Sequence, residues 1–329
     1  MKKEPNPNDV SLRAVARRLD ISIMTLYRVL NNVPTVKPAT CRRVLEELNR
    51  CGYYAHRPTR RRQAVLDFTQ HYYLEGLGLR LLHSLSGKNC SCVCTDHRRN
   101  PEPFFNAAAE SDVAVFFSIP DDEIIRKTRE VNPNIYTVTV TTRSSADVTV
   151  TADNTRGGEL AARHLHAAGH RHVAVHLAEE QPTRLERYKS FYAELKLLDP
   201  ACRIDVIAEE SGSSTAAACR SYLDAVDVMP TVIFFVAGGY AQSFWDDVVR
   251  PEPERFGELS IMSYDRPEDL FGGDAKFHPF DRIEFVPQDI LDWVEYYVTT
   301  RPVLQTRSPI HTNVAVRLVR AGSVRPVSR

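Results

Sequence analysis

The chain has 329 residues, 43% of them hydrophobic, and its 42 basic residues are balanced by 42 acidic ones. This length exceeds what one small core needs and predicts several domains. No apolar run reaches the ~20 residues of a membrane span, and the start MKKEPNPNDVSL lacks the apolar core of a signal peptide. With seven cysteines, which suit reduced thiols, these features predict a cytoplasmic protein without a membrane partner.

The first predicted elements are two short amphipathic helices separated by a tight turn. Ser11 is placed to cap the first helix, whose apolar residues recur at helical spacing up to Leu19. Asp20 suits the turn because aspartate tolerates left-handed backbone better than most residues. Ser22 then caps a second helix that continues to Leu30.

A third helix is predicted to begin at Pro38 and to end near Gly52. Three short helices, the first two joined by a tight turn, describe a helix-turn-helix unit. The alternative is a small three-helix bundle without a nucleic-acid role. Charge argues against that alternative, because residues 1–63 hold 14 basic and 5 acidic residues, a net +9, whereas the rest of the chain is net −9. A basic head on an acidic body favours double-stranded DNA as the partner of the head.

One stretch of the head, residues 15–53, reads VARRLDISIMTLYRVLNNVPTVKPATCRRVLEELNRCGY. It resembles the DNA-binding head of the lactose-repressor (LacI/GalR) family of bacterial transcription regulators. Asp20 replaces the family's turn glycine, Tyr27 a small serine and Lys37 a capping serine. The resemblance implies a homodimer on a pseudo-palindromic operator, most commonly acting as a repressor.

The candidate DNA contacts lie on the second helix, because that helix enters the major groove in such motifs. Ile23 and Met24 stand where the family varies its operator choice, and both suit contact with a thymine methyl group. Arg28 matches the family's DNA-contacting arginine, which takes a guanine edge or a phosphate. Tyr27 either contacts DNA or packs against the first helix. Phosphate contacts that fix the register are expected from Ser22, Thr25 and Asn31.

The linker that follows the head is strongly basic and ends in Arg60, Arg61 and Arg62. The family continues past its Gly-Tyr pair with a hinge helix whose leucine wedges into the minor groove, and Arg62 stands where that leucine belongs. Arginines are drawn to the negative potential of a narrow A·T minor groove. We therefore predict that the three arginines contact DNA electrostatically and bend it little. A disordered basic tether is the alternative.

Beyond the linker, apolar strands alternate with helical stretches such as Gly157–Ala168 and Leu185–Leu198. This alternation predicts an α/β body of parallel sheets covered on both faces, with enough strands for two lobes. The predicted domains are a helix-turn-helix head at 8–57, a linker at 58–63 and a two-lobed body at 64–329. The predicted strands are Ala64–Phe68, Cys90–Cys94, Val113–Phe117, Ile135–Val140, Val173–Leu177, Ile204–Ala208, Thr231–Val236 and Leu259–Tyr264.

Two stretches of the body, TADNTRGGELAARHLHAAGHRHVAV and LSIMSYD, match patterns of the same family. They resemble its periplasmic-binding-protein-like body, in which two lobes enclose a ligand cleft. The resemblance implies that Arg187 and Asp265 bind a sugar-like or nucleoside-like effector. It also implies that Tyr72 and Tyr73 stack on the ring of that effector. A surface or interlobe role is the alternative for each of these four residues.

The body departs from the family pattern at two places near these residues. Ser190 replaces a glycine that follows the ligand-binding arginine. Gly238 and Gly239 stand where the family often has an Asn-Asp pair that bonds the ligand. A typical sugar pose is therefore not expected.

Other clusters fit metal or enzyme chemistry less well. Cys90, Cys92 and Cys94 share a strand face but lack the Cys-x-x-Cys spacing of zinc sites, so we interpret them as buried strand cysteines. Five histidines between His164 and His176 span a helix, a turn and a strand and do not converge simply. No Ser/His/Asp arrangement or phosphate-binding loop is evident. We expect no metal, no cofactor and no enzymatic activity.

Two functions remain. The first is a transcription factor controlled by a small molecule in the interlobe cleft. The second is a DNA-bound interaction module, whose body docks a partner protein and binds no small molecule. A stabilising ligand favours the first, since binding raises apparent stability by mass action.

Overall fold

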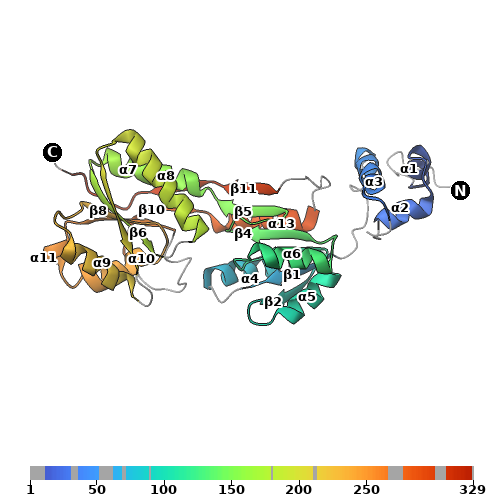
Figure 1. Cartoon of the computed structure of the whole chain (residues 1–329), viewed down its shortest axis with the longest axis horizontal. Coiled ribbons are helices and arrows are strands. Elements are labelled where there is room, and N and C mark those ends of the chain that lie inside the picture. The colour runs from blue at the N-terminus through green and yellow to red at the C-terminus, as the bar shows by residue number, and fades with distance from the viewer. Residues whose placement is uncertain are drawn as a thin grey trace.

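The computed structural model describes residues 12–30, 36–51, 62–68, 72–88, 90–178, 181–209, 213–265, 277–300 and 309–327. These residues form a small helical head and a body of two α/β lobes, which follow one another along the long axis of the molecule (Figure 1). No helix in these ranges is both long and apolar enough to cross a bilayer.

The head consists of helices α1 (Leu12–Arg18), α2 (Ile23–Leu30) and α3 (Pro38–Arg50). Asp20 has a φ of 53° in the turn between α1 and α2, the left-handed conformation expected there. Ser22 caps α2, because its hydroxyl accepts a hydrogen bond from the Thr25 N–H at 3.0 Å. The head has an apolar core of its own, formed by Val15, Ala16, Leu26, Val29, Val44 and Leu48.

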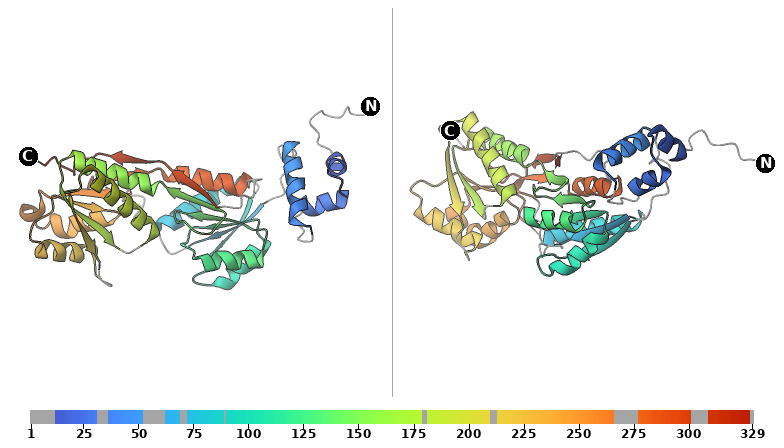
Figure 2. Two further views of the ribbon diagram at one scale, coloured as in Figure 1. Left: turned by 45° about the horizontal axis from the view of Figure 1, so that its top comes forward. Right: turned by 45° about the vertical axis from the view of Figure 1, so that its right-hand side comes forward.

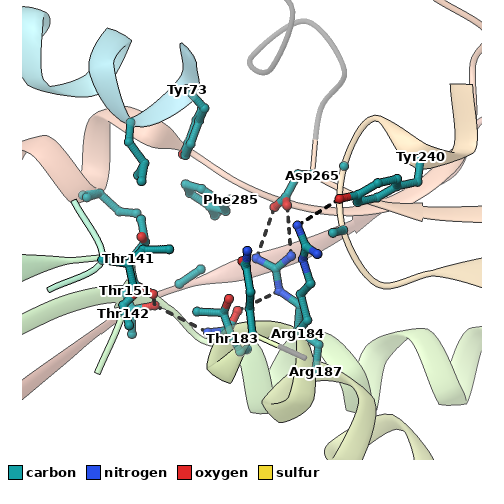
Figure 3. A pocket seen from close by; sticks show the side chains of 18 residues that line it. Tyr73, Thr141, Thr142, Thr151, Thr183, Arg184, Arg187, Tyr240, Asp265 and Phe285 are labelled. Carbon is teal, nitrogen blue, oxygen red and sulfur yellow. Dashed lines mark hydrogen bonds and ion pairs between the residues drawn. The ribbon is translucent and has the colours of Figure 1, made fainter. Parts of the chain in front are cut away.

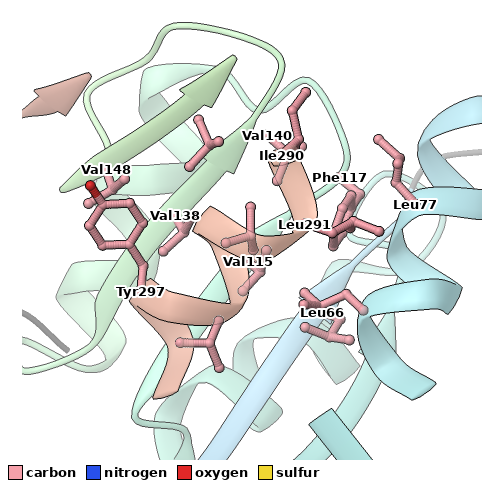
Figure 4. Packing of buried hydrophobic residues seen from close by; sticks show 14 of the residues in the cluster. Leu66, Leu77, Val115, Phe117, Val138, Val140, Val148, Ile290, Leu291 and Tyr297 are labelled. Atoms are coloured by element: carbon pink, nitrogen blue, oxygen red, sulfur yellow. The ribbon is translucent and has the colours of Figure 1, made fainter. Parts of the chain in front are cut away.

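The first lobe is built on a parallel sheet in the strand order β11-β5-β4-β3-β1-β2. One face is covered by α4 (Tyr72–Ser86) and α13 (Pro287–Thr300), whose apolar side chains interlock with the sheet (Figure 4). The other face is covered by α5 (Pro101–Glu110) and α6 (Asp122–Val131). The strands are β1 (Arg62–Asp67), β2 (Cys90–Thr95), β3 (Val113–Phe116), β4 (Tyr136–Val140), β5 (Val148–Ala152) and β11 (Ile310–Val314).

The second lobe repeats this plan with the strand order β12-β10-β9-β8-β6-β7. Helices α7 (Asn154–Ala167) and α8 (Pro182–Leu198) cover one face of its sheet. The other face is covered by α9 (Thr215–Ala225), α10 (Tyr240–Phe244) with the π-helical turn Trp245–Val249, and α11 (Pro253–Phe256). The strands are β6 (His172–Ala178), β7 (Arg203–Ala208), β8 (Val232–Phe235), β9 (Ser260–Tyr264), β10 (Asp281–Phe285) and β12 (Val316–Val319).

Two sequence expectations about the body need correction. β12 runs antiparallel to β10, so the second sheet is not wholly parallel. β1 begins at Arg62 rather than at Ala64, because Arg62 and Gln63 pair with Cys90 and Ser91 of β2. The last two residues assigned to the linker are therefore part of the first lobe.

Three connections join the lobes within the described residues, from β5 to α7, from β10 to α13 and from β11 to β12. They lie together, since Val314 pairs with Ala152 in the first sheet and Phe285 with Val316 in the second. The green and red segments that link the lobes in Figure 2 are these connections. A change in the angle between the lobes would have to be absorbed here.

Candidate ligand cleft between the lobes

A cavity of about 190 Å³ lies between the two lobes. Its walls come from both lobes and from their connections (Figure 3). Thr141, Thr142 and Thr151 line it from the first lobe, and Arg187 and Asp265 from the second. This is the position that open α/β sheets favour for ligands, outside the carboxyl ends of their strands.

Two of the lining residues hold left-handed backbone directly after a strand. Thr141 follows β4 with a φ of 70°, and Asp265 follows β9 with a φ of 63°. The conformation is strained for a β-branched residue such as threonine. Such strain concentrates at ligand sites, because the surrounding structure holds it in place.

Arg187, on α8, is fixed on several sides within the cavity wall. Its Nη1 donates to Oδ2 of Asp265 and to the Val236 carbonyl oxygen, both at 3.0 Å. Its Nε donates to Oδ1 of Asn154 at 2.8 Å. The guanidinium carbon lies 3.6 Å from the ring centroid of Tyr264, which is cation–π contact. The side chain is therefore oriented before any ligand arrives.

Arg187 and Tyr264 keep different charge states in this buried environment. Burial opposes the charge of Arg187, but the neighbouring Asp265 carboxylate raises its pKa above the ordinary value. Burial also raises the pKa of Tyr264, so this ring stays neutral. The cavity therefore presents a charged guanidinium beside a carboxylate, a donor and an acceptor that together suit hydroxyl groups.

Close packing of α7 on α8 and on β9 sets the position of Arg187. A Cβ added at Gly158 would lie 2.4 Å from the Arg187 carbonyl oxygen and 2.0 Å from Oγ of Ser190. A Cβ added at Gly157 would lie 1.9 Å from the Tyr264 hydroxyl. Only glycine permits this approach at the two positions.

Polar contacts also tie the lobes together beside the cavity. Arg143, in the loop after β4, forms an ion pair with Glu186 of α8 at 3.0 Å. The side-chain amide nitrogen of Asn154 lies 3.4 Å from Oγ1 of Thr151 and 3.4 Å from Oε2 of Glu186. The Arg143–Glu186 ion pair and the Asn154–Thr151 contact run between the lobes, whereas the Asn154–Glu186 contact joins α7 to α8 within the second lobe. The ion pair therefore couples the cavity wall to the angle between the lobes.

A second arginine, Arg184, faces the cavity one helical turn before Arg187. Its Nη2 donates to the hydroxyl of Tyr240 at 3.0 Å. Behind Tyr240 lies His176, with ring centroids 5.2 Å apart, and Nε2 of His176 is 2.9 Å from Oε1 of Glu209. Burial lowers the pKa of His176, although Glu209 opposes this.

The end of the cavity beside α4 and α13 is apolar and aromatic. Tyr73 and Phe285 meet edge to face, with ring centroids 6.3 Å apart. Leu74 and Ile290 lie beside them in the cavity wall. This end suits the face of a ring, whereas the end near Arg187 suits polar groups.

The structure brings three of the four predicted effector residues to one cavity, namely Tyr73, Arg187 and Asp265. Tyr72 is the first residue of α4, and its side chain lies outside the described residues. Asn154 and Arg184 were not predicted as site residues. Asn154 belongs to the matched Asp-Asn motif, which was a usable signal, whereas no sequence pattern marked Arg184.

The predicted DNA contacts on α2 differ in exposure. Met24 is 60% exposed, Tyr27 is 43% exposed and Arg28 is exposed as well. Ile23 is half-buried and packs against the head core. Tyr27 is therefore not buried against α1.

The remaining predicted DNA contacts are only partly described. The hydroxyl groups of Ser22 and Thr25 form a hydrogen bond, with Oγ and Oγ1 2.8 Å apart. Asn31, Arg60 and Arg61 lie outside the described residues. Arg62 donates from Nη1 to the Val298 carbonyl oxygen of α13 at 2.8 Å, so it contacts the first lobe.

The histidines of 164–176 do not converge, because four of them bond to different partners. These pairs are His164 with Asp281, His170 with Thr231, His172 with Asp205 and His176 with Glu209. Across the described ranges, no group of three or more His, Cys, Asp or Glu side chains is arranged to hold a metal ion.

No family model and no curated protein matches the sequence, but solved structures match the fold. A LacI transcriptional regulator from a Rhodococcus species superposes with a TM-score of 0.64 at 18% identity, covering 82% of this chain and 100% of that one. The Lac repressor dimer bound to operator and the anti-inducer ONPF superposes with a TM-score of 0.62 at 15% identity, covering 96% of this chain and 99% of that one. The transcriptional regulator CelR in its cellobiose complex superposes with a TM-score of 0.57 at 18% identity, covering 94% of this chain and 98% of that one. The chain therefore has the fold of LacI-family transcriptional regulators.

Proposed function

We propose that this chain is a sequence-specific DNA-binding transcriptional regulator, acting as a repressor, whose DNA affinity is set by a small molecule in the interlobe cleft. The observation that carries the proposal is the cavity built on the Arg187–Asp265 pair at the carboxyl ends of both sheets. The same chain carries a three-helix head within a segment of net charge +9. The fold shared with transcriptional regulators supports this function over an enzymatic one.

In this proposal the head is a helix-turn-helix domain and α2 is its recognition helix. Met24, Tyr27 and Arg28 are exposed on α2, and Ser22 and Thr25 lie at its N-terminal end, which enters the groove in such motifs. One head covers only a half-site, so the functional unit is a homodimer on a pseudo-palindromic operator.

Replacing Arg28 with alanine is expected to weaken binding to the cognate operator by on the order of 1–3 kcal/mol, if Arg28 takes a guanine edge. Changes at Met24 should instead alter which half-site is preferred. Fluorescence anisotropy with a labelled operator measures the first effect, and selection from a random duplex pool measures the second. Selection of the parental half-site by every such variant would show that α2 is not the recognition helix.

We propose that Arg60 and Arg61 contact the narrow minor groove at the operator centre. Arg62 is not included, because its guanidinium bonds Val298 of the first lobe. Changing Arg60 and Arg61 together to alanine should reduce the log–log salt slope of DNA binding by about one unit for each phosphate that is no longer neutralised. It should also weaken the preference for an A·T-rich centre. Arg62→Ala is the matched control, and an equal fall in slope for this control would contradict the assignment.

The proposed effector is a polyhydroxylated or nucleoside-like ring. Arg187 and Asp265 would bond its hydroxyls, and Tyr73 with Phe285 would pack against its ring. Thermal-shift screening of the full chain against sugars and nucleosides tests this. A ligand at 100 times its Kd should stabilise the protein by about 2.7 kcal/mol. If no compound shifts the transition, the interaction-module alternative is favoured.

A further inference from the structure

A surface groove of about 590 Å³ lies in the first lobe between α13 and β11, and we call it the α13–β11 groove. Asp289, Asp292, Trp293 and Tyr296 line it from α13, and residues 313–315 line it at the end of β11. None of these residues lines the interlobe cavity, so the groove is a separate feature of the surface. Among the described residues that line it, two are carboxylates and none is basic.

Two aromatic side chains form the wall that α13 contributes. Trp293 is 44% exposed and Tyr296 is 49% exposed, and their rings meet edge to face with centroids 5.9 Å apart. Trp293 also stacks on Tyr297 at 6.0 Å, and the Tyr297 hydroxyl is hydrogen-bonded to Oγ1 of Thr312 on β11 at 2.8 Å. Contacts between α13 and β11 therefore set the position of the indole. Exposed tryptophan and tyrosine held in this way are typical of the side chains that dominate protein interfaces.

The charge of the groove favours a basic partner. Asp289 lies four residues before Trp293 and Asp292 four residues before Tyr296, so the carboxylates and the rings share one exposed face of α13. Asp292 accepts a hydrogen bond from the Gln288 amide at 2.7 Å, which is a neutral donor. Ammonium and guanidinium groups are attracted both to carboxylates and to the faces of such rings. Lysine and arginine side chains therefore complement this surface, and acidic ones are repelled.

The opposite wall supplies backbone groups. β11 is an edge strand, and within the described ranges only β5 pairs with it. The Ile310 N–H donates to the Asp147 carbonyl oxygen, and the Val314 carbonyl oxygen accepts from the Asp153 N–H, both at 2.9 Å. Because successive residues of a strand direct their backbone groups to opposite sides, Asn313 directs its own away from β5. An edge strand of this kind can accept an extended chain as a further strand.

We propose that the α13–β11 groove docks an extended basic segment of a partner protein. The segment lies along β11 as an added strand, and its lysine or arginine side chains contact the rings of Trp293 and Tyr296 and the two carboxylates. The face of α13 from Asp289 to Tyr296 covers about 10 Å, which three residues of an extended chain span. Because alternate side chains of a strand share one face, the segment carries its basic residues at alternate positions. The inference depends neither on the effector nor on operator binding.

The test selects random twelve-residue peptides, displayed on phage, with the full-length chain, and the Trp293→Ala chain serves for counter-selection. We expect enriched peptides to carry lysine or arginine at alternate positions, without proline between them. In fluorescence anisotropy, a selected peptide should bind Trp293→Ala and Asp289→Lys at least tenfold more weakly than the parent chain. Leu79→Ala on α4 and Glu110→Gln on α5 are the matched controls, since both residues are exposed and lie outside the groove. Both controls should bind the peptide like the parent.

A second measurement uses the unaltered chain, in case Trp293→Ala fails to fold. Methylating the backbone nitrogens between the basic residues of the peptide should lower its affinity at least tenfold, because an added strand needs these donors. Unchanged affinity would mean that only the basic side chains bind, and would overturn the docking of a strand.

Other outcomes also overturn the proposal. These are a selection in which no enriched peptide depends on Trp293, and one in which the dependent peptides are neutral or acidic. A loss of binding in Leu79→Ala or Glu110→Gln equal to that in Trp293→Ala would do the same. Enriched peptides that match a basic segment of this chain would assign the groove to a second copy instead of a partner protein.

Discussion

Replacing Arg187 with methionine should lower the free energy of unfolding by about 3 kcal/mol and abolish the ligand-induced thermal shift. Removing one partner of a buried ion pair costs about 3–5 kcal/mol, because the other charge stays behind without compensation. Asp265 would be that charge, and Asn154 and the Val236 carbonyl would each lose a donor. The lower end of the range applies, since the Asp265 side chain is 18% exposed to solvent. Urea unfolding measures the change.

The matched control is the double variant Arg187→Met with Asp265→Asn, because asparagine tolerates the left-handed backbone at position 265. The double variant leaves no unpaired charge behind, so it should recover part of the lost stability. It should still fail to respond to ligand. Equal stability of the single variant and the parent, or a double variant less stable than the single one, would contradict the pairing.

Replacing Gly158 with alanine should cost about 2–3 kcal/mol, although alanine favours helices. The new methyl group would lie 2.4 Å from the Arg187 carbonyl oxygen and 2.7 Å from the Phe191 nitrogen, both backbone atoms of α8. The two helices must therefore move apart, which displaces Arg187 from the cavity wall. Urea unfolding should show the loss, and the thermal shift with ligand should shrink.

Gly76→Ala is the matched control for helix propensity. Gly76 lies within α4, and an added Cβ there meets no atom within 4 Å. This variant should gain about 0.5–1 kcal/mol, as expected for glycine to alanine inside a helix. A Gly158→Ala variant as stable as the parent would mean that the α7–α8 contact is looser than the structure shows.

The sequence predicted the elements whose patterning is local, and it missed those defined by long-range burial. The helices of the head and the strands near Val113 and Val173 occur where they were expected. β5, the run Val148–Ala152, was not predicted, although its valines and threonines favour strands. Both threonines are buried, and Oγ1 of Thr149 lies 2.9 Å from Oγ1 of Thr139 on the neighbouring strand.

β10, β11 and β12 were also not predicted. β10 reads DRIEF, a charged run that resembles a loop, yet Glu284 within it is 3% exposed. Arg282 and Arg317 form ion pairs with its carboxylate at 2.8 and 2.7 Å. The buried charge of Glu284 is therefore compensated only in the folded sheet. No single-strand pattern reveals a partner that lies 33 residues further along the chain.

The cavity was predictable only where a motif marked a residue. Arg187 and Asp265 were identified by the family resemblance, but their pairing across 78 residues was not. The ion pair of Arg143 with Glu186 depends on how the two lobes meet, and no sequence pattern marked the left-handed backbone of Thr141. For Arg62, the basic run gave no sign of its hydrogen bond to the Val298 carbonyl oxygen, because that partner lies 236 residues further along the chain.

The central claim, sequence-specific DNA binding by a dimer, is tested most directly by selection of DNA from a random duplex pool with the full-length chain, and Arg28→Ala is the comparison. We expect an enriched pseudo-palindrome, whose two half-sites match the two heads of a homodimer. The Arg28→Ala protein should enrich that sequence weakly. A pool without an enriched sequence, or an enriched site without two-fold symmetry, would contradict the proposal that this chain is a dimeric sequence-specific regulator.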